Sequence, residues 1–156
     1  MIKAYEPLHH KYRPTHFDEL VGQEPITSTL KQALISDRIS PAYIFSGPKG
    51  VGQKIVALRF FEGLIKTVSP GLSIRKRLEE LNHPDLLWVE PTYIYQGNLI
   101  KKSIAKEKDI HINRVPQIRL NQIREVKSFL GKKTLEADFA MIVIEDAETM
   151  HESSSN

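Results

Sequence analysis

The sequence predicts an α/β fold with a parallel sheet that helices cover on both faces. Short apolar runs alternate along the chain with longer segments of helical periodicity, which is the order of elements that parallel sheets require. The runs are apolar throughout rather than at every second position, as expected for strands buried on both sides. We find no hairpin signal between them, so we expect parallel pairing.

The first half of the chain is expected to contain two helices and one strand. A helical pattern opens at Pro25 and ends near residues 36–38. Residues 42–46 (AYIFS) form a short aromatic and branched run, which predicts a buried strand. A second helix follows from Gly52 to about Lys66. Its apolar residues cover more than one stripe, so we expect it to pack on two sides.

The second half is expected to contain two further strands and one amphipathic helix. Residues 86–90 and 140–144 have the composition of buried strands, and residues 118–130 repeat apolar positions with a helical period. The stretch 92–116 is polar, lysine-rich and weakly periodic. We interpret it as a long surface insertion rather than a domain. Another helix begins after the third strand, near residue 147.

Composition excludes several classes of protein. The 156 residues are 40% hydrophobic and 26% charged, with a formal net charge of +3, as in one soluble globular domain. The chain has no cysteine, which excludes a disulfide framework and a thiolate metal site. The six histidines show no metal-ligand spacing, so we expect no metal site. Without a membrane span or a signal peptide, a cytoplasmic location and no membrane contact are expected.

Three glycines have the spacing of a phosphate-binding loop. Such a loop wraps phosphates in backbone N–H groups, while a lysine reaches the outer phosphates and the next hydroxyl holds magnesium. Here Gln53 stands at the lysine position and Lys54 at the hydroxyl position. We expect at most weak binding of ATP, ADP, phosphate or sulfate, with no required cofactor; a tight turn that binds nothing is the alternative. The candidate binding residues are Gly47, Pro48, Lys49, Gly50, Val51, Gly52, Gln53 and Lys54.

An acidic pair, Glu145 and Asp146, follows the third predicted strand. Ligands of parallel sheets bind beyond the carboxyl ends of the strands, so this pair and the glycine loop are both expected at that edge. Many ATPases place Asp first, for the metal, and Glu second, for the attacking water. The order is reversed here, so we interpret the pair as degenerate and expect no catalytic residue. The alternative is a helix N-terminus that favours negative charge.

Three segments, taken in order, resemble the N-terminal region of bacterial sliding-clamp loader subunits of the AAA+ class. They are residues 11–23 (KYRPTHFDELVGQ), 42–52 (AYIFSGPKGVG) and 143–150 (VIEDAETM). The motor subunits of that family (tau/gamma) have an intact lysine–threonine loop, an Asp-Glu pair and a four-cysteine zinc module. This chain departs from them at all three. The departures resemble the delta-prime class, a stator-like subunit of the DNA polymerase III holoenzyme that supplies an arginine finger to a neighbour.

The resemblance implies a role in DNA replication without ATP turnover by this chain. Its partners would be the tau/gamma and delta subunits and, indirectly, the sliding clamp and primed DNA. Tyr12, Arg13, Pro14 and Val21 would line the adenine pocket of nucleotide-binding members. In the family a central strand, the arginine finger, the lid and the oligomerisation domain come later in sequence. We therefore expect a sheet truncated after the third strand, in a fragment or a truncated gene product.

Two other functions stay open on the sequence. One is an active AAA+ ATPase of the tau/gamma type that uses Lys54 unconventionally. The other is a basic DNA-binding module, in which the insertion stacks bases on tyrosines and pairs phosphates with lysines. The residues of that module would be Tyr93, Tyr95, Lys101, Lys102, Lys106 and Lys108.

Overall fold

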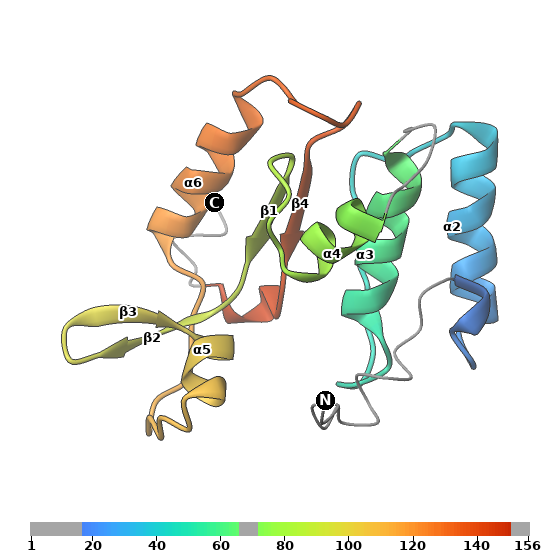
Figure 1. Ribbon diagram of the computed structural model, residues 1–156. Coiled ribbons are helices and arrows are strands. Elements are labelled where there is room, and N and C mark those ends of the chain that lie inside the picture. The colour runs from blue at the N-terminus through green and yellow to red at the C-terminus, as the bar shows by residue number, and fades with distance from the viewer. Residues whose placement is uncertain (1–16, 66–71, 151–156) are drawn as a thin grey trace, which may run out of the picture. The chain divides into compact units, whose positions relative to one another are not determined.

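The computed structural model describes residues 17–65 and 72–150. The chain divides into two compact units, unit 1 (Met1–Lys66) and unit 2 (Thr67–Asn156). Figure 1 shows helices α2 and α3 of unit 1, and the strands and remaining helices of unit 2. A small parallel sheet accompanied by helices confirms the predicted α/β class.

The described part of unit 1 contains a 3-10 turn, η1 (Phe17–Glu19), and two α-helices, α2 (Glu24–Ser36) and α3 (Gln53–Leu64). Both helices were predicted. α2 has Pro25 in its first turn, where the missing N–H of proline costs nothing. It packs closely on α3: a Cβ added at Gly63 would lie 2.6 Å from Cδ1 of Leu34. Every residue of 56–62 is buried, which confirms that α3 is covered on more than one side.

The prediction of a strand at residues 42–46 was wrong. The segment forms no ladder with any described strand, and Ile44 is 94% exposed. Tyr43 instead sets its ring edge-on to Phe60 of α3, with 5.0 Å between ring centroids. A strand needs a neighbour to satisfy its backbone groups. The described part of unit 1 contains no second strand, so apolar composition alone does not produce one.

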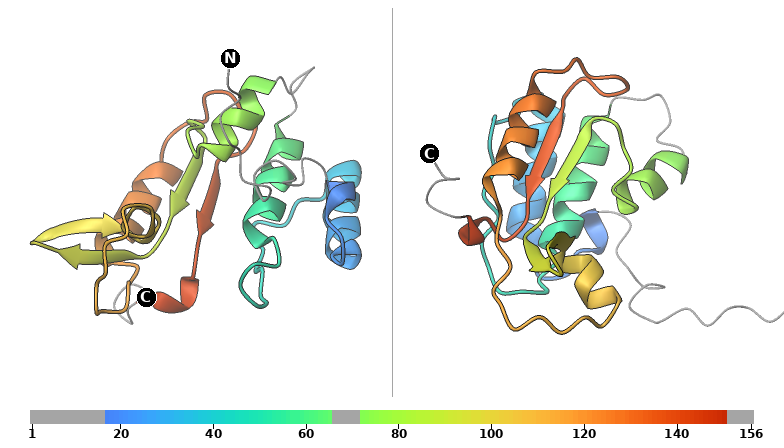
Figure 2. Two further views of the ribbon diagram at one scale, coloured as in Figure 1. Left: turned by 60° about the horizontal axis from the view of Figure 1, so that its bottom comes forward. Right: turned by 90° about the vertical axis from the view of Figure 1, so that its left-hand side faces the viewer.

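Unit 2 is built on two parallel strands, β1 (Leu86–Val89) and β4 (Met141–Ile144), both of which were predicted. Leu86 lies opposite Met141, and Val89 lies opposite Ile144. The predicted helix α6 (Leu120–Leu130) lies beside this pair and contacts β1 (Figure 2). A further helix, α4 (Leu72–Glu79), precedes β1. The pairing brings the carboxyl ends of β1 and β4 to one edge, where the acidic pair follows.

The predicted insertion contains regular structure that the sequence analysis missed. β2 (Thr92–Tyr95) and β3 (Asn98–Lys101) form an antiparallel hairpin, followed by the short helix α5 (Lys102–Glu107). Gln96 and Gly97 connect the strands with φ of 51° and 78°, the backbone of a two-residue type I′ turn. The parallel pairing expected of the predicted strands is confirmed for β1 and β4, but the hairpin inside the insertion was not predicted. A Gln-Gly pair between TYIY and NLIK was the signal.

The insertion is anchored to the rest of unit 2 on its return. Thr92 and Gln117 exchange two backbone hydrogen bonds, at 2.9 and 3.0 Å. Ile118, which is fully buried, then donates its N–H to the carbonyl of Thr149 at 3.2 Å. Thr149 ends η2 (Ala147–Thr149), the 3-10 turn that follows the acidic pair. The base of the hairpin is thus tied to the segment just beyond β4, and residues 151–156 of the expected helix lie outside the described residues.

Candidate functional site

The glycine loop in unit 1 has a left-handed or otherwise positive-φ backbone at each of its three glycines. Gly47, Gly50 and Gly52 have φ of 148°, 91° and 94°, a region that glycine adopts without strain. Gly52 is the N-cap of α3, and its carbonyl accepts the N–H of Val56 at 2.9 Å. The loop leads directly into a helix N-terminus, where backbone N–H groups bind anions in many proteins. Pro48 and Lys49 are exposed, and Val51 and Lys54 are half-buried.

Gln53, at the lysine position, closes this loop on itself. Its side-chain Nε2 donates a hydrogen bond to the carbonyl oxygen of Gly47 at 3.3 Å. The carboxamide is uncharged, and one of its N–H groups is engaged inside the loop. A lysine would add a charge-assisted contact to phosphate that is worth roughly 1.5–3 kcal/mol. The position at which a phosphate-binding loop carries its lysine therefore holds a neutral side chain here, bonded within the loop.

The segment that contains Val21 lies against the end of the glycine loop. Leu20 is buried, and its Cδ2 lies 3.7 Å from the position that a Cβ on Gly52 would take. The turn is fixed by Glu24, whose carboxylate accepts the N–H of Gly22 at 3.0 Å. Val21 itself is 91% exposed. Tyr12, Arg13 and Pro14, the other residues expected near a base, lie outside the described residues.

The acidic pair in unit 2 is engaged by side chains of the same unit. The indole Nε1–H of Trp88 donates to Oε2 of Glu145 at 3.0 Å. The ammonium group of Lys102 forms an ion pair with Asp146. The hydrogen bond to Asp146 raises the pKa of Lys102; partial burial opposes this shift, and the negative charges of Asp146 and Glu145 add to it. Lys102 is therefore charged at neutral pH, and both carboxylates have intramolecular partners.

The backbone around Lys102 is held in place by a buried carboxylate. Ser103 donates both its N–H, at 2.9 Å, and its hydroxyl, at 2.8 Å, to Glu90, which is 7% exposed. Gln122 of α6 donates its side-chain N–H to the carbonyl of Glu90 at 2.8 Å. Lys102 donates its own N–H to the carbonyl of Pro91 at 2.9 Å. These contacts position the start of α5, and with it the ammonium group that meets Asp146.

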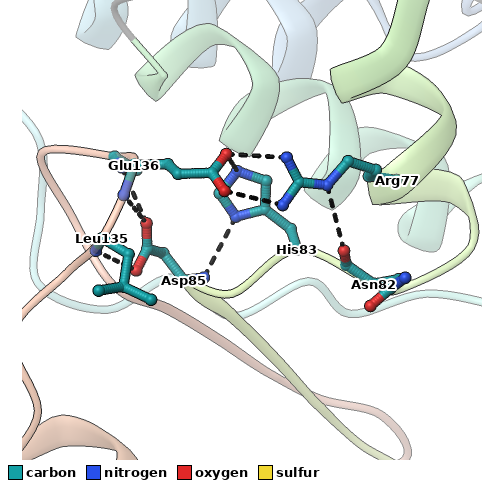
Figure 3. A network of polar contacts seen from close by, with 7 residues as sticks. Arg77, Asn82, His83, Asp85, Leu135 and Glu136 are labelled. Atoms are coloured by element: carbon teal, nitrogen blue, oxygen red, sulfur yellow. Dashed lines mark hydrogen bonds and ion pairs between the residues drawn. The ribbon is translucent and has the colours of Figure 1, made fainter.

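A second buried carboxylate, Asp85, organises the opposite end of the parallel strands (Figure 3). It precedes β1 and accepts the backbone N–H groups of Leu135, Glu136 and Ala137, each at 2.8 Å. Burial by itself would raise the pKa of Asp85, but these three hydrogen bonds outweigh it and lower the pKa. Asp85 thereby fixes the loop that leads into β4.

His83 and Arg77 complete this second network. Arg77 donates two hydrogen bonds to the carboxylate of Glu136, at 2.8 and 2.9 Å. The Nδ1 atom of His83 accepts the N–H of Asp85 at 3.2 Å. Burial lowers the pKa of His83, so its ring is neutral at pH 7 and acts as an acceptor. The network has a structural role at the amino end of the sheet, away from the acidic pair.

The described residues contain no group of three or more His, Cys, Asp or Glu side chains that would hold a metal ion. Within residues 17–65 and 72–150, no helix is long and apolar enough to cross a membrane.

Comparison with known families identifies the origin of these features. The family model described as DNA polymerase III, delta subunit, matches residues 22–156. The chain belongs to this DNA polymerase III family. The match covers the glycine loop, the insertion and the acidic pair, so all three are parts of one clamp-loader type of chain, and the family functions in DNA replication.

Curated relatives match a shorter part of the chain. The DNA polymerase III subunit tau of Bacillus subtilis is 46% identical over 57 residues, which are 36% of this chain and 10% of the relative. The gamma/tau subunit of Mycobacterium tuberculosis H37Rv is 54% identical over 46 residues, 30% and 8% of the two chains. The tau/gamma subunit of Haemophilus influenzae is 43% identical over 61 residues, 39% and 9%. The matched segment thus spans a tenth or less of each relative, and no solved structure matches.

The ion pair between Lys102 and Asp146 was not indicated by the sequence. One interpretation of the insertion counted Lys102 among DNA-contacting lysines, but its ammonium group pairs with Asp146, 44 residues later. Glu90, which positions the backbone beside Lys102, and Asp85, which fixes the loop before β4, also carried no motif. A contact between residues so distant in sequence leaves no periodic signal. The only local indication was an acidic residue at each end of the apolar run 86–89.

Proposed function

We propose that this chain is a stator-like subunit of the DNA polymerase III clamp loader, of the delta-prime type, that does not hydrolyse ATP. It would serve DNA replication by helping to load the sliding clamp onto primed DNA, through contacts with tau/gamma and delta subunits. It would need no cofactor, although the loop retains a form that suits weak phosphate binding. Membership of the family supports the assignment to the replication machinery.

The observation that carries the proposal is Gln53. Phosphoryl transfer depends on positioned charge around the outer phosphates more than on covalent chemistry by the protein. At the position where a lysine would supply that charge, this chain has a neutral amide that donates to Gly47 of its own loop. The acidic pair supports the same conclusion, because Asp146 is paired with Lys102 and Glu145 with Trp88.

The alternative is a motor subunit of the tau/gamma type. The relatives described above carry tau and gamma in their names, and their matched segments are 43–54% identical to this chain. This alternative requires nucleotide binding and turnover, with Lys54 as the contact to phosphate.

The two functions differ in ATP turnover. The purified chain should show background hydrolysis with and without primed DNA, measured beside a tau/gamma subunit as positive control. It should also be retained by immobilised tau/gamma and delta subunits of the same organism, in a manner that does not depend on ATP bound to this chain. DNA-stimulated turnover comparable to that of the positive control, abolished by Lys54→Ala, would establish the motor alternative and refute the stator.

A further inference from the structure

We infer that Lys102 is a built-in counter-ion that takes the place of a divalent cation at the carboxyl end of β4 and keeps Glu145 and Asp146 from binding metal. The inference rests on the proposed function, because it says how two carboxylates persist at this edge of the sheet without supporting hydrolysis. It concerns unit 2 alone.

The donor set of the acidic pair does not fit a divalent cation. Magnesium takes a near-octahedral shell of oxygen ligands at roughly 2.0–2.1 Å. Asp146 already holds the ammonium group of Lys102, and one oxygen of Glu145 accepts the indole N–H of Trp88. A second cation at Asp146 would stand beside a fixed positive charge and be repelled by it. The ammonium group of Lys102 therefore disfavours a metal ion at Asp146.

Lys102 is placed by the fold rather than by chance contact on the surface. Its N–H is bonded to Pro91, and the next residue, Ser103, makes two hydrogen bonds to the buried Glu90. The side chains of Lys102 and Asp146 are 33% and 20% exposed, so solvent screens this pair less than a fully exposed one. Three separate contacts thus deliver one ammonium group to one carboxylate.

Lys101 gives a matched control for Lys102. It is the adjacent residue, carries the same charge and is exposed at the end of β3. Methionine replaces lysine at similar length without charge and without adding an oxygen ligand. Comparing Lys102→Met with Lys101→Met therefore separates the position of the charge from the net charge of the protein.

The experiment measures Mn²⁺ binding by the full chain, in the absence of nucleotide and partners. Trp88 is the only tryptophan and donates to Glu145, so paramagnetic quenching of its fluorescence reports a metal at the pair. A count of free Mn²⁺ by electron paramagnetic resonance gives the affinity. Lys102→Met should bind Mn²⁺ about tenfold or more tightly than wild type, because a unit charge beside the site is removed. Lys101→Met and Lys102→Arg should behave as wild type.

Two results would overturn the inference. One is a Mn²⁺ affinity of Lys102→Met equal to that of Lys101→Met, with thermal melting confirming that both are folded. The other is a gain that survives in Lys102→Met/Asp146→Asn, because the metal would then lie elsewhere. Either leaves the proposed function intact if wild type still lacks ATP turnover. Turnover by wild type would refute the proposed function, whatever the Mn²⁺ affinities are.

Discussion

Asp85 shows how much one buried carboxylate holds together in unit 2. It is 3% exposed and accepts three backbone N–H groups from the loop before β4. Asp85→Asn keeps the size but turns one acceptor oxygen into a donor that faces N–H groups. We expect the free energy of unfolding to fall by roughly 2–4 kcal/mol, since charge-assisted bonds are lost and buried donors are left unsatisfied. Urea denaturation followed by circular dichroism measures the change.

Asp138 provides the control for this substitution, because it is an exposed carboxylate in the same loop. Asp138→Asn should change stability by less than about 0.5 kcal/mol. The pKa of Asp85 is lowered from 3.8, so its contribution is fully present above that value and is lost as pH falls through the folded-state pKa. Equal stability of the two variants at pH 7 would show that the three hydrogen bonds do not matter.

The helices could be predicted from the sequence of each segment alone, whereas the strands also depend on a pairing partner elsewhere in the chain. α2, α3 and α6 were predicted because helical periodicity lies within the element itself. β1 and β4 were predicted from their composition, and pairing between them confirmed it. Residues 42–46 have a similar composition but no partner among the described strands. Strand formation is decided by the neighbour, which the composition of one segment does not reveal.

The β2–β3 hairpin was not predicted because residues 92–116 are mostly polar and lysine-rich, which favoured an irregular loop over the signal of the Gln-Gly turn.

Two substitutions in this turn should change the stability of the hairpin in opposite directions. Gly97 has φ of 78° and open space where a Cβ would go. Gly97→Ala should therefore destabilise the hairpin by about 1 kcal/mol through backbone strain alone. Gln96→Asn should stabilise it by a few tenths of a kcal/mol, because asparagine tolerates the left-handed conformation of that position. Amide hydrogen exchange of residues 92–101 should quicken in Gly97→Ala and slow in Gln96→Asn. Changes of the same sign in both variants would contradict the type I′ assignment.

At the scale of the whole molecule, two departures from an ATPase lie in two separate units. The glycine loop belongs to unit 1 and the acidic pair to unit 2. Both departures are visible in the sequence, because each is a change of residue type within a recognisable spacing. The sequence did not predict the contacts made at these positions, since the bond from Gln53 to Gly47 and the pair of Lys102 with Asp146 depend on folded geometry. Motifs indicate which groups are missing, and the fold shows what occupies their places.

Substitutions that rebuild the glycine loop of unit 1 should therefore increase ATP binding without producing ATP hydrolysis. Gln53→Lys with Lys54→Thr rebuilds the lysine and hydroxyl of the loop, whose three glycines already have positive φ. We expect the affinity for ATP to rise about tenfold to a hundredfold, as one charge-assisted contact is gained, and ATP to raise the melting temperature of this variant. Gln53→Met, which only removes the bond to Gly47, should gain nothing. Hydrolysis should stay at background, because Asp146 and Glu145 remain engaged in unit 2; turnover by the repaired loop alone would show that the acidic pair is not blocked.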